Sequence, residues 1–226
     1  MLGKISQSNS TMKYSEQSIK VLRQMYMLLM FSILAASGIA AFVTQTGMAA
    51  MVSSSPGMYT IGSLVVMIGL IIMAHKNVNS SSALVWYSLF VAAMGVTSGI
   101  ALTGYVQTGQ MAAIANAAVG TLVIFGTLTA YSYASGRDFS QMRGFLLVGL
   151  IGLIVMLLLN VFFIQSGPLM MALSVIGVLV FSGFILYDTS NVLHGHETNY
   201  VSASISMFLN IVNLFHFLLN LMSGRE

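Results

Sequence analysis

The sequence predicts an all-α integral membrane protein, a bundle of seven transmembrane helices, on the basis of three observations. Only 6% of its 226 residues are charged, against about 25% in an ordinary soluble domain. Hydrophobic residues make up 57% of the chain, which excludes disorder because disordered chains are poor in apolar residues. These residues fall into seven runs, each close to the roughly 20 residues that a helix needs to cross a bilayer.

Short linkers with turn-forming residues separate the seven runs, as at Pro56-Gly57 and Ser135-Gly136. Pro168 falls in the first turn of the sixth run, where a helix tolerates proline. No linker is long enough to hold a soluble domain. We therefore expect a polar tail over 1–24, one helical domain over 25–222 and a short tail over 223–226. The runs cover residues 25–46, 58–74, 83–105, 112–134, 144–164, 168–193 and 200–222.

The basic residues predict how the bundle is oriented. On one side lie the segment before the first run and the linkers after the second, fourth and sixth runs, and this side carries seven of the eight Lys and Arg residues. Because such residues favour the cytoplasm, we expect a cytoplasmic N-terminus and, after seven spans, an outside C-terminus. A basic tail suits anionic lipid headgroups. Nucleic-acid binding would need a folded basic face with base-reading groups, so we expect the bilayer and no nucleic acid as partner.

The residue inventory excludes several classes of seven-helix protein. An inward N-terminus argues against a G-protein-coupled receptor. A retinal protein needs a lysine in its last helix, whereas the last lysine here is Lys76. Asp188 is the only acidic residue in any predicted span, so the carboxylate pair of an aspartyl protease is missing. There is no Gly-x-Ser-x-Gly turn and no cysteine. We expect no enzymatic activity and no cofactor.

Polar side chains inside the membrane are concentrated in the last two predicted helices. An ionisable residue there costs about 2.5–3.5 kcal/mol on insertion scales, which makes Asp188 a functional candidate. Six polar residues of the last helix project into one arc of about 120°, which we expect to face the bundle interior. This polar stripe is consistent with an ion or proton pathway, or with interhelical hydrogen bonds of about 0.6 kcal/mol each. It consists of Ser202, Ser206, Asn210, Asn213, His216 and Asn220.

Two local patterns predict structure more than chemistry. His194-Gly195-His196-Glu197 contains metal-ligand types, but a structural zinc site needs four ligands in a defined geometry, so a polar loop is the favoured interpretation. We expect Gly195 to end the sixth helix and Glu197 or Thr198 to cap the seventh. Gly95-x-x-x-Gly99 predicts close helix packing, within the chain rather than between copies.

Two motifs carry a family resemblance. The first is Asp188-Thr-Ser-Asn191-Val-Leu-His194-Gly195-His-Glu197-Thr-Asn199-Tyr200, followed by Asn213-Leu-Phe in the last helix, and the second is Arg137-Asp138-Phe-Ser140 after the fourth. Together they resemble the Bax inhibitor-1 family, also called LFG or TMBIM, and in particular its bacterial YccA-like branch. Residues 183–215 are the specific part, while the first five spans match mainly by hydropathy and spacing.

The resemblance implies a bacterial inner-membrane protein with its seventh helix at the centre and its C-terminus in the periplasm. Characterised members are pH-sensitive calcium leak channels with an aspartate pair between the sixth and seventh helices and a basic group on the second. Asp188 matches one aspartate, Asn210 stands at the other position, and Lys76 is the candidate basic group. One carboxylate cannot titrate as a coupled pair.

The YccA-like branch is associated instead with the membrane protease FtsH, as its substrate and modulator. The resemblance therefore implies FtsH modulation. The alternative is a leak of Ca²⁺ or another cation through Asp188, Asn210 and Asn213.

Overall fold

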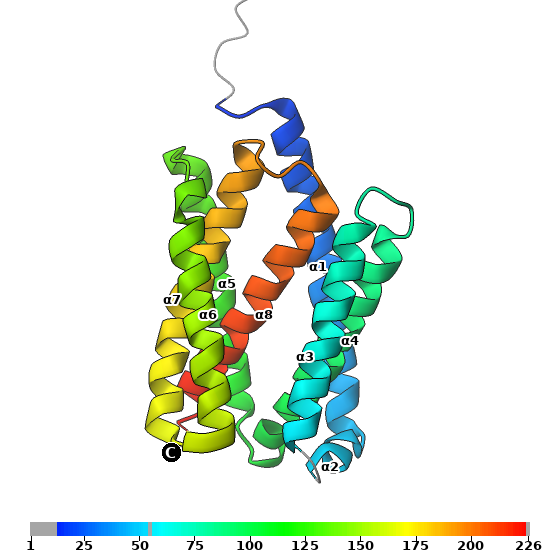
Figure 1. Ribbon diagram of the computed structural model, residues 1–226, viewed down its shortest axis with the longest axis vertical. Coiled ribbons are helices and arrows are strands. Elements are labelled where there is room, and N and C mark those ends of the chain that lie inside the picture. The colour runs from blue at the N-terminus through cyan, green and yellow to red at the C-terminus, as the bar shows by residue number, and fades with distance from the viewer. Residues whose placement is uncertain (1–12, 54–55, 225–226) are drawn as a thin grey trace, which may run out of the picture.

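The computed structural model describes residues 13–53 and 56–224, and this part of the chain is a bundle of helices without strands (Figure 1). Seven of the helices are long and apolar enough to cross a membrane, as the sequence predicted. The helices are α1 (Glu16–Gln45), α2 (Met48–Ser53), α3 (Pro56–Lys76), α4 (Ala83–Gln107), α5 (Met111–Ser135), η1 (Ser140–Met142), α6 (Arg143–Leu159), η2 (Asn160–Ile164), α7 (Gly167–Leu193) and α8 (Tyr200–Met222).

The first helix begins at Glu16 rather than at residue 25. Ser15 caps it by accepting a 3.0 Å hydrogen bond from the Ser18 N–H, and Leu22 is buried in the first turns. Residues 16–24 therefore belong to the bundle, although the sequence indicated a polar tail there. An apolar window does not detect this stretch because its buried residues alternate with exposed polar ones.

Other boundaries agree more closely with the sequence. The last span matches residues 200–222, and Pro168 lies in the first turn of α7 as expected. The predicted fifth span, residues 144–164, consists of α6 followed by the π-helix η2, and the short helix η1 precedes it. Hydropathy alone does not distinguish the α-helical part from the π-helical part. In η2 the buried Asn160 accepts a 3.0 Å hydrogen bond from the Ser166 N–H through its side chain. That bond closes the turn into α7.

The helix α8 contacts α7, α5 and α1 extensively and touches α4 and α3. Half of the residues in its apolar stretch are buried, the largest share among the seven candidate spans. Met207, Phe208 and Leu214 are fully buried there. By contrast, α3 and α6 expose apolar side chains along most of their length, as expected of helices that face lipid.

The helices α1 and α4 pack closely through the predicted glycine motif. A Cβ atom added at Gly99 would lie 2.7 Å from the Val43 Cβ and 2.8 Å from the Ala40 carbonyl oxygen. At Gly95 it would lie 2.9 Å from the Ala36 carbonyl oxygen. Small residues let two backbones approach this closely, so the prediction of packing within the chain is confirmed.

Four segments meet at one end of the bundle, which we call the basic end: residues 13–15, 77–82, 136–142 and 194–199 (Figure 1). The Lys13 Nζ donates to the Ala134 carbonyl at 2.6 Å, and the Asn199 Nδ2 donates to the Val78 carbonyl at 3.1 Å. The described basic residues lie in or near these segments. They are Lys13, Lys20, Arg23, Lys76, Arg137 and Arg143.

Candidate functional site

The two polar positions predicted to face each other in the membrane do so. The Asn210 Nδ2 donates a 2.6 Å hydrogen bond to the Asp188 Oδ2, which joins α8 to α7. Further along the same interface, the Ser174 hydroxyl donates to the Asn220 Oδ1 at 3.0 Å. A Cβ at Gly177 would meet the ring of Phe217, so this face of α7 packs directly on α8.

The remaining members of the polar stripe have other surroundings. The Asn213 Nδ2 donates to the Leu209 carbonyl of its own helix at 2.8 Å and does not join Asp188. The His216 Nε2 is buried and has no hydrogen-bond partner among the described residues. The Ser202 hydroxyl donates to the Glu197 Oε2 at 2.7 Å. Among the residues described, Asn210 is thus the member of the stripe that bonds to Asp188.

Lys76 lies at the end of α3 with an exposed side chain. In the part of the chain that the structure describes, it forms no ion pair with Asp188, whose side chain bonds to Asn210. The reason lies in the packing, because α3 lies mainly against α4 and barely touches α8. Lys76 as the basic partner of the pair therefore stays a prediction that no hydrogen bond or ion pair between the described residues supports.

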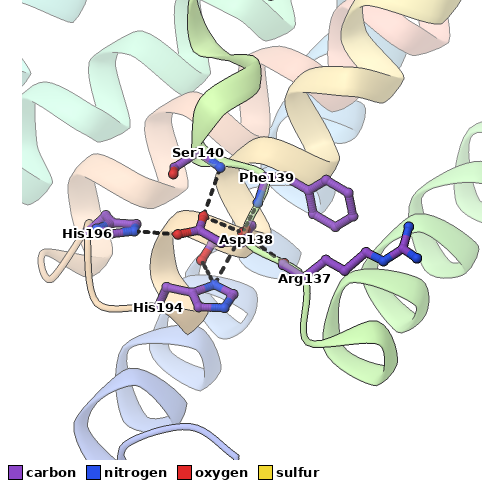
Figure 2. A network of polar contacts seen from close by, with 7 residues as sticks. Arg137, Asp138, Phe139, Ser140, His194 and His196 are labelled. Atoms are coloured by element: carbon purple, nitrogen blue, oxygen red, sulfur yellow. Dashed lines mark hydrogen bonds and ion pairs between the residues drawn. The ribbon is translucent and has the colours of Figure 1, made fainter.

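A second polar network lies at the basic end around Asp138 (Figure 2). The Asp138 Oδ1 accepts a 2.9 Å hydrogen bond from the Ser140 N–H, and its Oδ2 lies 3.1 Å from the His196 Nε2. The Ser140 N–H and then His196 hold the pKa of the Asp138 carboxyl well below its usual range, because both stabilise the charged form. This contact joins the loop before α6 to the loop before α8.

Ser190 links the same two loops from the end of α7. Its hydroxyl accepts from the Phe139 N–H at 2.9 Å and lies 3.3 Å from the His194 Nδ1. The side chain of Ser190 is fully buried. Its hydroxyl therefore holds the two loops together and is not exposed as a nucleophile would be. Figure 2 shows the Arg137 side chain pointing away from this network, so the Arg137-Asp138 motif contributes its carboxylate here and leaves its guanidinium free of these contacts.

The turn between α7 and α8 is built by the family motif. Gly195 has a φ of 76°, which ends α7 as predicted. The Asn191 carbonyl accepts the N–H groups of His196 and Glu197 at 2.8 and 3.1 Å. Tyr200 is the first residue of α8. The motif thus supplies turn geometry that brings α8 back against α7.

The cap of α8 was predicted wrongly. Its N-cap is Asn199, whose Oδ1 accepts the N–H groups of Val201 and Ser202 at 2.9 and 3.2 Å. Glu197 supports the cap by accepting the Asn199 N–H at 2.8 Å. Asparagine at this position reaches the free N–H groups of the first turn directly.

No group of three or more His, Asp or Glu side chains that could hold a metal ion is found among the residues described.

Two residues of this site were missed because the sequence placed them in the polar tail. The Lys13 Nζ donates to the Ala134 carbonyl, and the Tyr14 hydroxyl donates to the Tyr133 carbonyl at 3.0 Å. Both satisfy carbonyls at the end of α5 that lack partners within the helix. The Tyr14 ring also meets the His194 ring edge-on, with centroids 5.6 Å apart. Nothing local in the sequence signals these contacts.

The family model described as "Inhibitor of apoptosis-promoting Bax1" matches residues 19–226. The chain belongs to the Bax inhibitor-1 family. It is 40% identical over 214 residues to an uncharacterized membrane protein of Vibrio cholerae, covering 94% of this chain and 93% of that protein. It is 32% identical over 203 residues to the Modulator of FtsH protease YccA of Escherichia coli, covering 90% and 89% of the two chains.

Similarity extends to a eukaryotic member of the family. The chain is 37% identical over 155 residues to Bax inhibitor 1 of Schizosaccharomyces pombe, covering 68% of this chain and 55% of that protein. The resemblance inferred from the motif at residues 188–200 is therefore confirmed. For this member of the Bax inhibitor-1 family, the structure defines two polar centres, the Asp188–Asn210 pair in the membrane and the Asp138 network at the basic end.

Proposed function

We propose that this chain is a non-enzymatic modulator of the FtsH protease in the bacterial inner membrane and acts in membrane-protein quality control. The observation that supports the proposal is its similarity, over 90% of its length, to a relative named Modulator of FtsH protease YccA. A cytoplasmic N-terminus, inferred from the distribution of basic residues, would present the basic end to a cytoplasmic protease domain.

The packing of the basic end suggests how a partner would meet the protein. Lys13 and Tyr14 attach the start of the described chain to the end of α5, and the Asp138–His196 contact joins two loops beside them. We propose that a protease complex contacts this joined surface and also recognises residues 1–12. The tail proposed to be recognised by the protease is therefore shorter than residues 1–24, because α1 begins at Glu16.

Co-purification from native membranes tests this proposal. The full chain should bring down FtsH, and a variant lacking residues 2–12 should bring down less while keeping the Lys13 and Tyr14 contacts. A variant lacking residues 223–226, at the opposite end, serves as the matched control and should behave like the full chain. Absence of FtsH from all three samples would refute the proposal.

A second candidate function is a cation leak, favoured by the 2.6 Å contact between Asn210 and Asp188 at the position of the family's aspartate pair. Calcium flux into liposomes should fall when Asp188 is replaced by alanine. Equal, background-level flux in wild type and Asp188→Ala would exclude a channel. Asn210→Asp should make the flux pH-dependent, because two close carboxylates share one proton. A flat pH response would count against the pairing.

A further inference from the structure

A groove of about 440 Å³ runs along α1 beside the end of α5, at the basic end of the bundle. Its lining includes Arg23, Tyr26, Met27 and Met30 of α1 and Tyr133 of α5. Met27 and Met30 are about half exposed, and Tyr133 is 52% exposed. The groove is therefore open to the surroundings, with an apolar floor and one cationic group.

Arg23 has no counter-charge in the described part of the chain. Its side chain is exposed and forms no hydrogen bond or ion pair with a described residue. Asp138, Asp188 and Glu197 all accept hydrogen bonds from other groups. Glu16 lies seven residues earlier on α1, about 10 Å along the helix axis. An anion that neutralises Arg23 must therefore come from outside these residues.

The depth of the groove matches the boundary between headgroups and acyl chains. The 30 residues of α1 span about 45 Å, longer than the roughly 30 Å hydrocarbon core, and its apolar run begins at Met25. Arg23 lies just before that run, whereas Met27 and Met30 lie about 6 and 10 Å further along the axis. With the run from Met25 placed in the hydrocarbon core, one side of the groove lies at phosphate level and the other at the level of the first acyl carbons.

We propose that this groove binds one anionic phospholipid. The Arg23 guanidinium pairs with the phosphate, since its planar fork matches phosphate oxygens. The acyl chain lies along Met27 and Met30, whose flexible thioethers adapt to an irregular apolar surface. Tyr133 lies at the level of the membrane–water interface, where aromatic rings are favoured. Lys20, exposed one turn before Arg23, adds attraction for a negatively charged headgroup.

Native mass spectrometry of the full chain tests the proposal with phosphatidylglycerol and phosphatidylcholine of identical acyl chains. Wild type should retain phosphatidylglycerol in preference. Arg23→Gln should lower the phosphatidylglycerol affinity about fivefold and leave phosphatidylcholine unchanged, as expected for one basic group at an anionic lipid. Arg143→Gln, which removes a basic residue of α6 from the same end but outside the groove, is the matched control and should match wild type.

A second pair of variants separates the lipid site from general charge attraction. Met30→Trp should fill the groove and weaken retention of both lipids. Arg23→Lys should keep part of the preference for phosphatidylglycerol. Size-exclusion chromatography shows whether each variant is folded, and Arg23→Lys still tests the proposal if Arg23→Gln is not. Equal retention of the two lipids by wild type would overturn the proposal. An equal loss of phosphatidylglycerol affinity in Arg143→Gln and Arg23→Gln would also overturn it. Binding of glycerol phosphate as tightly as phosphatidylglycerol would overturn it too.

Discussion

The side-chain amide of Asn210 donates a 2.6 Å hydrogen bond to the Asp188 carboxylate and so ties α8 to α7 within the membrane. Among the described residues, Asn210 is the hydrogen-bond partner of that carboxylate. Asn210 is buried, and its neighbours Met207, Phe208 and Leu214 belong to the core. The polar pair is therefore set into the most buried helix of the bundle.

Replacing Asn210 by leucine should destabilise the protein by about 1–3 kcal/mol, because the carboxylate of Asp188 loses its donor. The measurement is the midpoint of thermal unfolding in detergent. Asn213→Leu is the matched control, since Asn213 bonds within its own helix and should cost less. Equal losses in the two variants would show that the bond between α7 and α8 contributes nothing specific.

Replacing Gly99 by alanine should destabilise the protein by about 1–3 kcal/mol, because the new Cβ would overlap the backbone of Ala40. Unfolding of the purified protein measures the effect. Gly69→Ala provides the comparison, because a Cβ there meets nothing within 4 Å and alanine favours a helix. A Gly99→Ala variant as stable as Gly69→Ala would contradict the close packing of α1 on α4.

Acid should weaken the basic end through Asp138. Its pKa is lower in the folded state than the ordinary value of about 3.9, so its contribution to stability is complete above that value and is lost as the pH falls through the folded pKa. Asp138→Asn should therefore flatten the fall of the unfolding midpoint below about pH 4. Identical acid slopes for variant and wild type would exclude this role.

The Ser140 N–H is the largest cause of the lowered pKa of Asp138, so removing that donor gives an independent check. Ser140→Pro eliminates the N–H, and a helix tolerates proline at its first position, but Phe139, with φ −94° and ψ 7°, must shift toward an extended conformation. We expect the pKa of Asp138 to rise toward its ordinary value, as followed by NMR of the carboxyl carbon. An unchanged pKa of Asp138 in this variant would mean that another group keeps it low.

The orientation of the bundle can be measured directly because the chain contains no cysteine. Ser80→Cys lies in the exposed linker between α3 and α4, and Thr108→Cys lies in the exposed linker between α4 and α5 at the opposite end. With a cytoplasmic N-terminus, an impermeant maleimide should label Thr108→Cys in intact spheroplasts and spare Ser80→Cys until lysis. The reverse pattern would invert the predicted topology.

The number and order of the spans could be predicted from the sequence because the bilayer imposes a length and an apolar composition on each helix. The close packing at Gly95 and Gly99 could also be predicted, since the four-residue spacing places both glycines on one helix face. The first turns of α1 were misjudged because residues 16–24 mix buried and exposed side chains, and only packing against other helices reveals which are buried.

By itself the sequence determined a seven-span helical membrane protein and, through its motifs, the Bax inhibitor-1 family. The tertiary structure decided which polar groups meet. Asp138 and His196 are 58 positions apart, and Lys13 and Ala134 are 121 apart, so neither contact leaves a local signal. Hydropathy acts on each helix separately, whereas these contacts depend on how the helices rotate and where their connecting loops close.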